Sequence, residues 1–263
     1  KPGTKYEGVV IKGRVSDEVK KYFYNMKIAK KAETPEQTKR RLDTETIRKE
    51  TGTAGHTTLQ DLLELYANGT GSRSKILANS PFNEFQFKRL ENGIKDIIKQ
   101  AKEQQKLIDP KGKAIFKTEQ LIIDKGADTG GTIDLLVLYS DGSAGIFDYK
   151  FVSPSIEAGY VKYMGGQYKI VNDPFAVKMD TYNIQLGAYK QTLLNEYGIT
   201  KVRQSRIVPI HIRYKYNTEG KITGNITTVQ MGARFSEFLE QIPVAEEMTD
   251  FDKVNDLIIK LIN

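Results

Sequence analysis

The chain has 263 residues, of which 39% are hydrophobic, so it can enclose a core, and no apolar run reaches the length of a membrane span. It has no cysteine, which excludes disulfides, thiolate zinc sites and iron–sulfur clusters. Its net charge of +7 suits a polyanionic partner, because Lys and Arg neutralise phosphates when proteins bind nucleic acid.

The first 50 residues are basic and polar, and we expect them to be helical, with a helix start at residues 34–36. They form either a solvated helical face or a surface that meets nucleic acid. A second helix is predicted from residue 51 to the Asn68-Gly69 pair, followed by a polar loop over residues 70–74. Its apolar side chains recur at helical spacing: Leu59, Leu62, Leu63 and Tyr66.

The remaining predicted elements alternate between the two types. In chain order they are a helix over 84–107, strands over 115–123, 132–139 and 144–152, a helix over 182–197, strands over 207–216 and 222–229, and a helix near 254–261. This order predicts one α/β domain over residues 51–263, a central mixed β-sheet flanked by helices, behind a basic N-terminal segment over 1–50. His211 is expected on the polar side of its strand, without a role.

Three charged side chains stand out in the two central strands. Asp134 is the one charged residue in a strand that is apolar on both faces, where an unneutralised carboxylate is costly. Asp148 and Lys150 lie two residues apart on the next strand and therefore project from the same face. Such a cluster predicts either a cation site or a buried group of ion pairs.

The turn between these strands decides whether the two carboxylates meet. A two-residue turn at Asp141-Gly142 would place Asp134 opposite Tyr149 and point it away from Asp148. A three-residue loop over residues 140–142, with Gly142 left-handed, would place Asp134 opposite Asp148. Their Cβ atoms would then be about 4.5–5.5 Å apart, close enough to share one cation. Oxygen ligands of this kind suit Mg²⁺ or Mn²⁺, whereas the alternative is a salt-bridge cluster of the same three residues.

Several motifs appear together in a fixed order. The two strands carry Gly-x-x-Asp, ending at Asp134, and Asp-x-Lys, from Asp148 to Lys150. Upstream, Gly52 and His56 form Gly-x-x-x-His, and downstream a Gln-x-x-x-Tyr motif follows on a predicted helix. The residues of that last motif are Gln185 and Tyr189, and an acidic residue on the preceding strand is Glu119. Taken singly, His56 is more often a core or capping histidine, Gln185 and Tyr189 a packing pair, and Glu119 a surface residue.

Together, over about residues 51–190, these motifs resemble the RecB-like branch of the PD-(D/E)XK nuclease superfamily. The resemblance implies Mg²⁺- or Mn²⁺-dependent hydrolysis of DNA phosphodiester bonds by Asp134, Asp148 and Lys150. It implies metal contacts from His56, Asp134, Asp148, the Tyr149 carbonyl and the supporting Glu119. Gln185 and Tyr189 would orient the site or the substrate. Members that hold an iron–sulfur cluster use four cysteines, which this chain lacks.

The resemblance leaves the biological setting open. It is consistent with a cytoplasmic enzyme of DNA repair, recombination or phage DNA metabolism, acting alone or with a larger DNA-processing or viral protein. The alternative is an inactive nucleic-acid-binding or assembly module that kept the fold. Residues 153–181, rich in Tyr and Lys, form either an entry for single-stranded nucleic acid or an exposed loop. Exonuclease and endonuclease activity are not distinguished.

Overall fold

A computed structural model describes residues 13–16, 34–152, 174–218 and 222–231 of the chain. Within these residues no helix is long and apolar enough to cross a membrane. The predicted helix near residues 254–261 and the Tyr- and Lys-rich stretch up to residue 173 lie outside the described residues.

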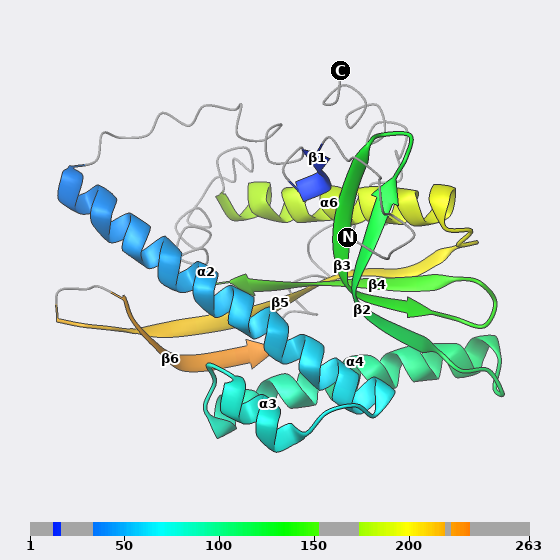
Figure 1. The fold of residues 1–263 in the computed structure, drawn as a ribbon, viewed down its shortest axis with the longest axis horizontal. Helices are drawn as coiled ribbons and strands as arrows, with labels where there is room; N and C mark the ends of the chain where they lie inside the picture. The colour runs from blue at the N-terminus through cyan, green and yellow to red at the C-terminus, as the bar shows by residue number, and fades with distance from the viewer. Residues whose placement is uncertain (1–12, 17–33, 153–173, 219–221, 232–263) are drawn as a thin grey trace, which may run out of the picture.

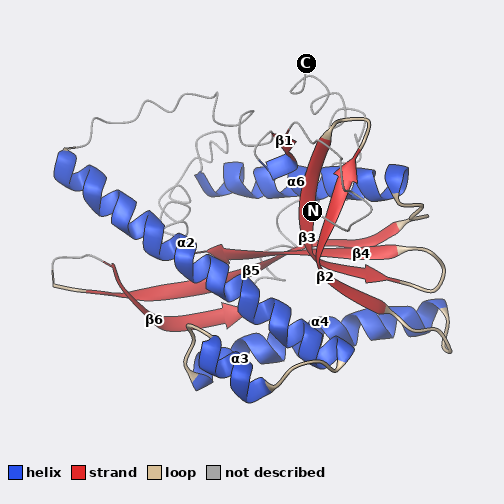
Figure 2. Cartoon of the chain, in the orientation of Figure 1, coloured by secondary structure: helices blue, strands red, loops and turns tan. Residues whose placement is uncertain are grey.

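A mixed sheet of six strands forms the centre of the fold (Figures 1 and 2). Its strands are β1 (Gly13–Arg14), β2 (Ile115–Asp124), β3 (Thr129–Leu138), β4 (Ala144–Val152), β5 (Val202–Tyr216) and β6 (Ile222–Met231). The order is β1-β3-β4-β5-β6, and β2, which lies outside this order, also pairs with β3. β3 and β4 are antiparallel and β4 and β5 are parallel, so the predicted α/β fold with a mixed sheet is confirmed.

Helices cover both faces of this sheet (Figure 1). They are α2 (Pro35–Leu63), the π-helix η1 (Glu64–Asn68), α3 (Arg73–Asn79), α4 (Glu84–Ile108) and α6 (Pro174–Glu196). The apolar side chains of α2, α3 and α4 form one buried cluster with the sheet, and those of α6 form a second. Each face of the sheet therefore has its own core, and the central strands are covered on both sides.

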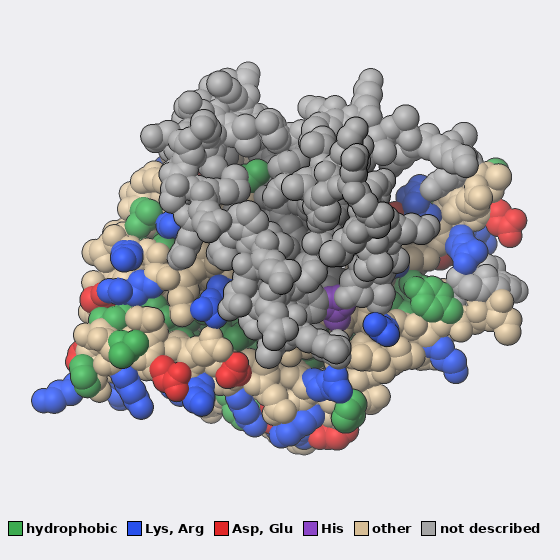
Figure 3. Space-filling model, turned by 180° about the vertical axis from the view of Figure 1, so that it is seen from behind, with side chains coloured by type: hydrophobic (Ala, Val, Ile, Leu, Met, Phe, Trp, Pro, Cys, Tyr) green, Lys and Arg blue, Asp and Glu red, His purple; other side chains and the backbone are tan. Residues whose placement is uncertain are grey.

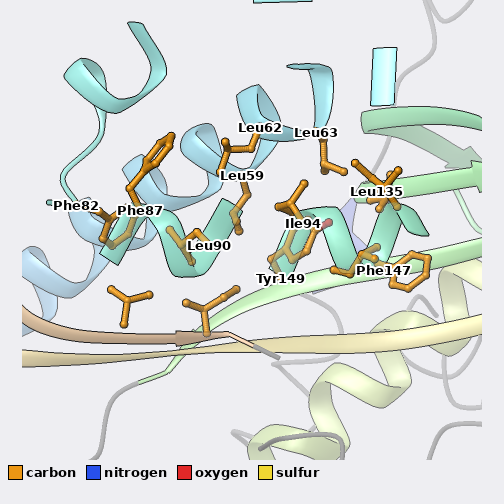
Figure 4. Packing of buried hydrophobic residues seen from close by; sticks show 14 of the residues in the cluster. Leu59, Leu62, Leu63, Phe82, Phe87, Leu90, Ile94, Leu135, Phe147 and Tyr149 are labelled. Carbon is orange, nitrogen blue, oxygen red and sulfur yellow. The ribbon is translucent and has the colours of Figure 1, made fainter. Parts of the chain in front are cut away.

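The alternation along β4 assigns its side chains to these two cores. Phe147 and Tyr149 belong to the cluster under α2 and α4, whereas Ile146 belongs to the cluster under α6. Figure 4 shows Tyr149 and Phe147 beside Ile94 of α4. Since successive strand residues point to opposite faces, Asp148 projects toward the α6 side of the sheet.

One long helix replaces the two that the sequence predicted over residues 34–68. α2 begins at the expected place, where the Thr34 hydroxyl caps the Gln37 amide in a reciprocal capping box. It then continues through residues 50 and 51 without a break. The apparent start at residue 51 reflected the onset of burial along the helix, because its buried positions run from Thr51 to Leu63.

Three smaller predictions were also wrong. The expected polar loop at residues 70–74 contains the start of α3, whose one buried residue, Ile76, is too little to create an apolar pattern. α6 starts at Pro174 rather than near residue 182. His211 is buried rather than on a polar side, because β5 lies between β4 and β6 and is covered on both faces.

Candidate metal centre

The β3–β4 connection has the three-residue loop, one of the two alternatives that the sequence left open. The Tyr139 amide donates to the Ser143 carbonyl at 2.9 Å, and the Gly142 amide donates to the Tyr139 carbonyl at 3.1 Å. Gly142 has a φ of 80°, a left-handed conformation that favours glycine. The prediction of a loop over residues 140–142 is confirmed, and the register that it sets continues to Leu135 opposite Phe147, one position short of Asp134 and Asp148.

The ladder between β3 and β4 opens at that position. Pairing ends with Leu135 opposite Phe147. In a regular ladder the Tyr149 amide would next donate to the carbonyl of Ile133, because hydrogen-bonded pairs alternate along an antiparallel pair. Instead, it donates to the Asp134 carboxylate, Oδ2, at 2.6 Å. The side chain of Asp134 thus replaces a backbone acceptor, and this replacement holds the carboxylate at the point where the strands separate.

The strand β2, which also pairs with β3, is distorted opposite Asp134. Thr118 pairs with Leu135 and Gln120 with Ile133, so Glu119 lies opposite Asp134. Glu119 has a φ of 46°, a conformation that costs a non-glycine residue about 1–3 kcal/mol and is concentrated at functional sites.

The π-helix η1, which continues α2, contacts β2 next to the strained residue Glu119. The Thr118 hydroxyl donates to Glu64 Oε1 of η1 at 2.7 Å. Glu64 also accepts from Asn68 Nδ2 at 2.8 Å, and these hydrogen bonds, led by that from Asn68, lower the pKa of Glu64. The bond between Glu64 and Thr118 therefore ties β2 to the helix that carries His56, next to the strained residue.

Three side chains from three elements converge here. His56 of α2, Glu119 of β2 and Asp134 of β3 each offer a ligand atom, and these atoms all lie within 4.8 Å of one another. His56 Nδ1 is 3.7 Å from Asp134 Oδ2. The ring of His56 is further positioned by an edge contact with Phe151, with centroids 5.4 Å apart. One imidazole nitrogen and two carboxylates are donors that divalent cations accept.

The electrostatics of this group match a cation site. Burial, followed by the nearby Asp148 charge, raises the pKa of Asp134 to about 8 despite the opposing effect of Lys150. Burial, followed by the Lys150 charge, lowers the pKa of His56 to about 4, so its imidazole is neutral near pH 7 and can act as a ligand. A bound cation would favour the ionised form of Asp134 that burial opposes.

Asp148 and Lys150 lie beside this group rather than in it. Asp148 Oδ2 is 2.5 Å from Lys150 Nζ, and burial raises the pKa of the Asp148 carboxyl. Lys150 Nζ also lies 4.9 Å from the ring centroid of Tyr182 on α6. The ion pair that the sequence offered as an alternative is therefore present for these two residues, while Asp134 takes part in the group with His56 and Glu119.

The Gln-x-x-x-Tyr motif lies on the α6 side of the sheet. Gln185 Nε2 donates to Tyr189 Oη at 2.7 Å, and burial raises the pKa of Tyr189 to about 12. A Cβ atom at Gly131 would lie 2.4 Å from the Tyr189 ring, so the glycine of Gly-x-x-Asp is required by this packing. The structure thus links these two motifs to each other, and neither Gln185 nor Tyr189 joins the group of three potential ligands.

An open cavity of about 740 Å³ contains the converging side chains. Those that the sequence singled out are His56, Glu119, Asp134, Tyr149 and Lys150. The sequence reasoning missed the rest of the wall that α2 contributes, including Arg48, Lys49 and Gln60. A pattern could have revealed it, because Arg48, Gly52, His56 and Gln60 recur every four residues and so share one helix face.

Comparison with protein-family models, with characterised proteins and with solved structures finds no match to this chain. The resemblance to RecB-like nucleases therefore depends on the sequence motifs alone. What the structure adds independently is the spatial meeting of residues from Gly-x-x-x-His, Gly-x-x-Asp and the strand that carries Glu119.

Proposed function

We propose that this chain is a divalent-metal-dependent nuclease with a PD-(D/E)XK-like site that hydrolyses phosphodiester bonds in DNA. The observation that carries the proposal is the convergence of His56, Glu119 and Asp134 within 4.8 Å, at an open cavity that Lys150 also lines. These residues are separated by up to 78 positions in the sequence (134 − 56) and come from three elements.

The donor set fits Mn²⁺ and Mg²⁺, with the imidazole nitrogen favouring the softer Mn²⁺. His56, Glu119 and Asp134 would hold the ion. Such an ion supplies a polarised phosphate and a bound water of lowered pKa. Lys150 lines the same cavity and would offset negative charge on the substrate phosphate, and Asp148 holds its ammonium in place. DNA as the substrate is consistent with a cytoplasmic setting in a bacterial or phage-infected cell.

The first test compares cleavage of a DNA oligonucleotide with Mn²⁺, Mg²⁺ or EDTA. We expect cleavage with either ion and none with EDTA. Glu119→Gln should weaken Mn²⁺ binding in calorimetry and reduce cleavage, because it removes a ligand charge. Asp61→Asn is the matched control, since it removes a carboxylate from α2 outside this cavity. Cleavage by the parent protein in EDTA equal to that in Mn²⁺ would refute the proposal.

One observation favours a second candidate function. The ion pair between the buried Asp148 and the partly buried Lys150 is short, an arrangement that also serves as a structural cross-link in a sheet. A module that binds nucleic acid without cleaving it would keep this pair. It would bind DNA with the same affinity in Mn²⁺ and in EDTA and would release no product in either.

A further inference from the structure

The cavity around the candidate metal centre extends along α2. Its lining includes both Arg48 and Gln60, and every intervening lining residue from this helix lies on one face. A helix rises 1.5 Å per residue, so these two residues are about 18 Å apart along the axis. The cavity is therefore a groove with a helical wall, and His56 lies part-way along it.

Charge is distributed unevenly along this groove. The lining residues that α2 contributes are Arg48, Lys49, Gly52, Thr53, His56, Thr57 and Gln60. Two of them are cationic, both at the N-terminal end of the wall, and none is acidic. The lining carboxylates, Glu119 and Asp134, come from the sheet and belong to the metal centre. Once a divalent cation neutralises that pair, the remaining charges that line the groove are positive, at Lys150 and at Arg48-Lys49.

The middle of the wall leaves room for a ligand. Among the described residues, no heavy atom would lie within 4 Å of a Cβ atom at Gly52, so this part of the structure leaves the wall open between the cationic end and His56. Thr53 and Thr57 flank this opening with hydroxyl groups. A groove that is open, polar and cationic at intervals suits a chain of phosphates better than a single compact phosphate ester.

We propose that the α2 wall from Arg48 to Gln60 binds a DNA strand, with Arg48 and Lys49 contacting a backbone phosphate about three nucleotides from the bond that is cut. This inference depends on the proposed nuclease function. Seven or eight helical residues separate His56 from the two cations, which corresponds to about 11 Å along the axis. A strand advances about 3.4 Å per nucleotide, which gives the stated offset of about three. The substrate is accordingly a polynucleotide rather than a mononucleotide.

The test uses single-stranded oligothymidylates whose length increases from about two to about twelve nucleotides. For the full chain with Mn²⁺, we expect kcat/KM to rise sharply once the strand can reach from the metal to Arg48-Lys49, at about four nucleotides. The double variant Arg48→Gln, Lys49→Gln should lose this rise, by about 10- to 100-fold on long strands, and match the parent on the shortest. The DNA affinity of this variant should also depend less on salt, with a slope of log affinity against log salt concentration that is shallower by about one.

The matched control is Lys102→Gln, Lys106→Gln, which removes the same charge from exposed positions on α4. It should keep the length dependence of the parent. Equal losses in both double variants would mean that only overall charge matters, and would overturn the inference. The inference would also be overturned if the parent cleaves DNA and the Arg48, Lys49 variant shows the same dependence of kcat/KM on strand length. The nuclease proposal would then remain intact.

The same experiment shows whether the nuclease proposal fails while the groove still binds DNA. If the parent does not cleave but binds long strands more tightly than short ones, and only the Arg48, Lys49 variant loses this preference, then the groove is a binding site and the nuclease proposal is wrong. Melting temperatures of all three proteins identify any loss that comes from unfolding.

Discussion

Replacing Asp134 with Asn tests the metal centre most directly, because it keeps the shape of the side chain and removes its charge. In the folded protein burial raises the pKa of Asp134 to about 8, against 3.8 for the ordinary group. The folded state therefore disfavours the ionised form, and without metal the protein should lose stability as pH rises from about 4 through about 8. At about 1.36 kcal/mol per pKa unit, the loss at pH 7 is at most about 4 kcal/mol.

This figure is an upper bound, because Asp148 and Lys150 are close enough to share the charge. For a chain of this size, 1 kcal/mol corresponds to about 2–4 °C in Tm. Asp134→Asn should therefore raise the Tm of the metal-free protein at pH 7 and flatten its dependence on pH. The parent should regain stability with Mn²⁺, by about 2.7 kcal/mol at a concentration of 100 times Kd, and the variant should not.

Cleavage and binding should change in opposite ways in the same variant. Loss of the ligand charge should reduce cleavage by several orders of magnitude, because metal-dependent activation of phosphate and water is lost. DNA affinity should be unchanged or higher, since a carboxylate that repels phosphate is gone. Calorimetry and oligonucleotide cleavage on parent and variant measure these effects. Parent-like cleavage by Asp134→Asn, or stability of the metal-free parent that rises from pH 4 to pH 8, would refute the reasoning.

Three further predictions concern the surroundings of the centre. Gly55→Ala should lower Tm by the equivalent of about 1–3 kcal/mol, because its Cβ would lie 2.3 Å from a phenylalanine ring, whereas Gly52→Ala on the same helix should raise it by about 0.5–1 kcal/mol. Thr118→Val should weaken Mn²⁺ binding by about 10- to 100-fold through loss of the bond that supports β2, and Thr118→Ser should retain the affinity of the parent. Lys150→Ala should abolish cleavage and lower Tm by leaving Asp148 buried and unpaired, and a second change, Asp148→Asn, should restore Tm but not cleavage. Thermal melts, calorimetry and cleavage assays check these outcomes, and a Thr118→Val protein with parental Mn²⁺ affinity would show that the hydroxyl has no positioning role.

Local sequence determined the elements that depend on neighbouring residues. The α4 helix was predictable because its apolar residues repeat on one face and Asn83 caps its start. The β3–β4 loop was reduced to two alternatives, since a glycine at position 142 suits a left-handed conformation in either. The apolar strand around Asp134 marked that carboxylate as unusual, whereas His56 and Glu119 became candidate ligands only through the resemblance of the motifs.

Tertiary structure decided how these pieces combine, because the deciding contacts join residues far apart in the chain. The left-handed conformation of Glu119 is enforced by pairing on both sides of it, which no local preference of glutamate would favour. Asp148 pairs with Lys150 and stays outside the group of three, a choice that depends on where the strands separate. The groove along α2 exists only because the helix is continuous through residue 51, since its wall includes both Arg48 and Gln60. Sequence periodicity reports burial, so it did not show that the helix expected to start at residues 34–36 and the one expected from residue 51 are continuous.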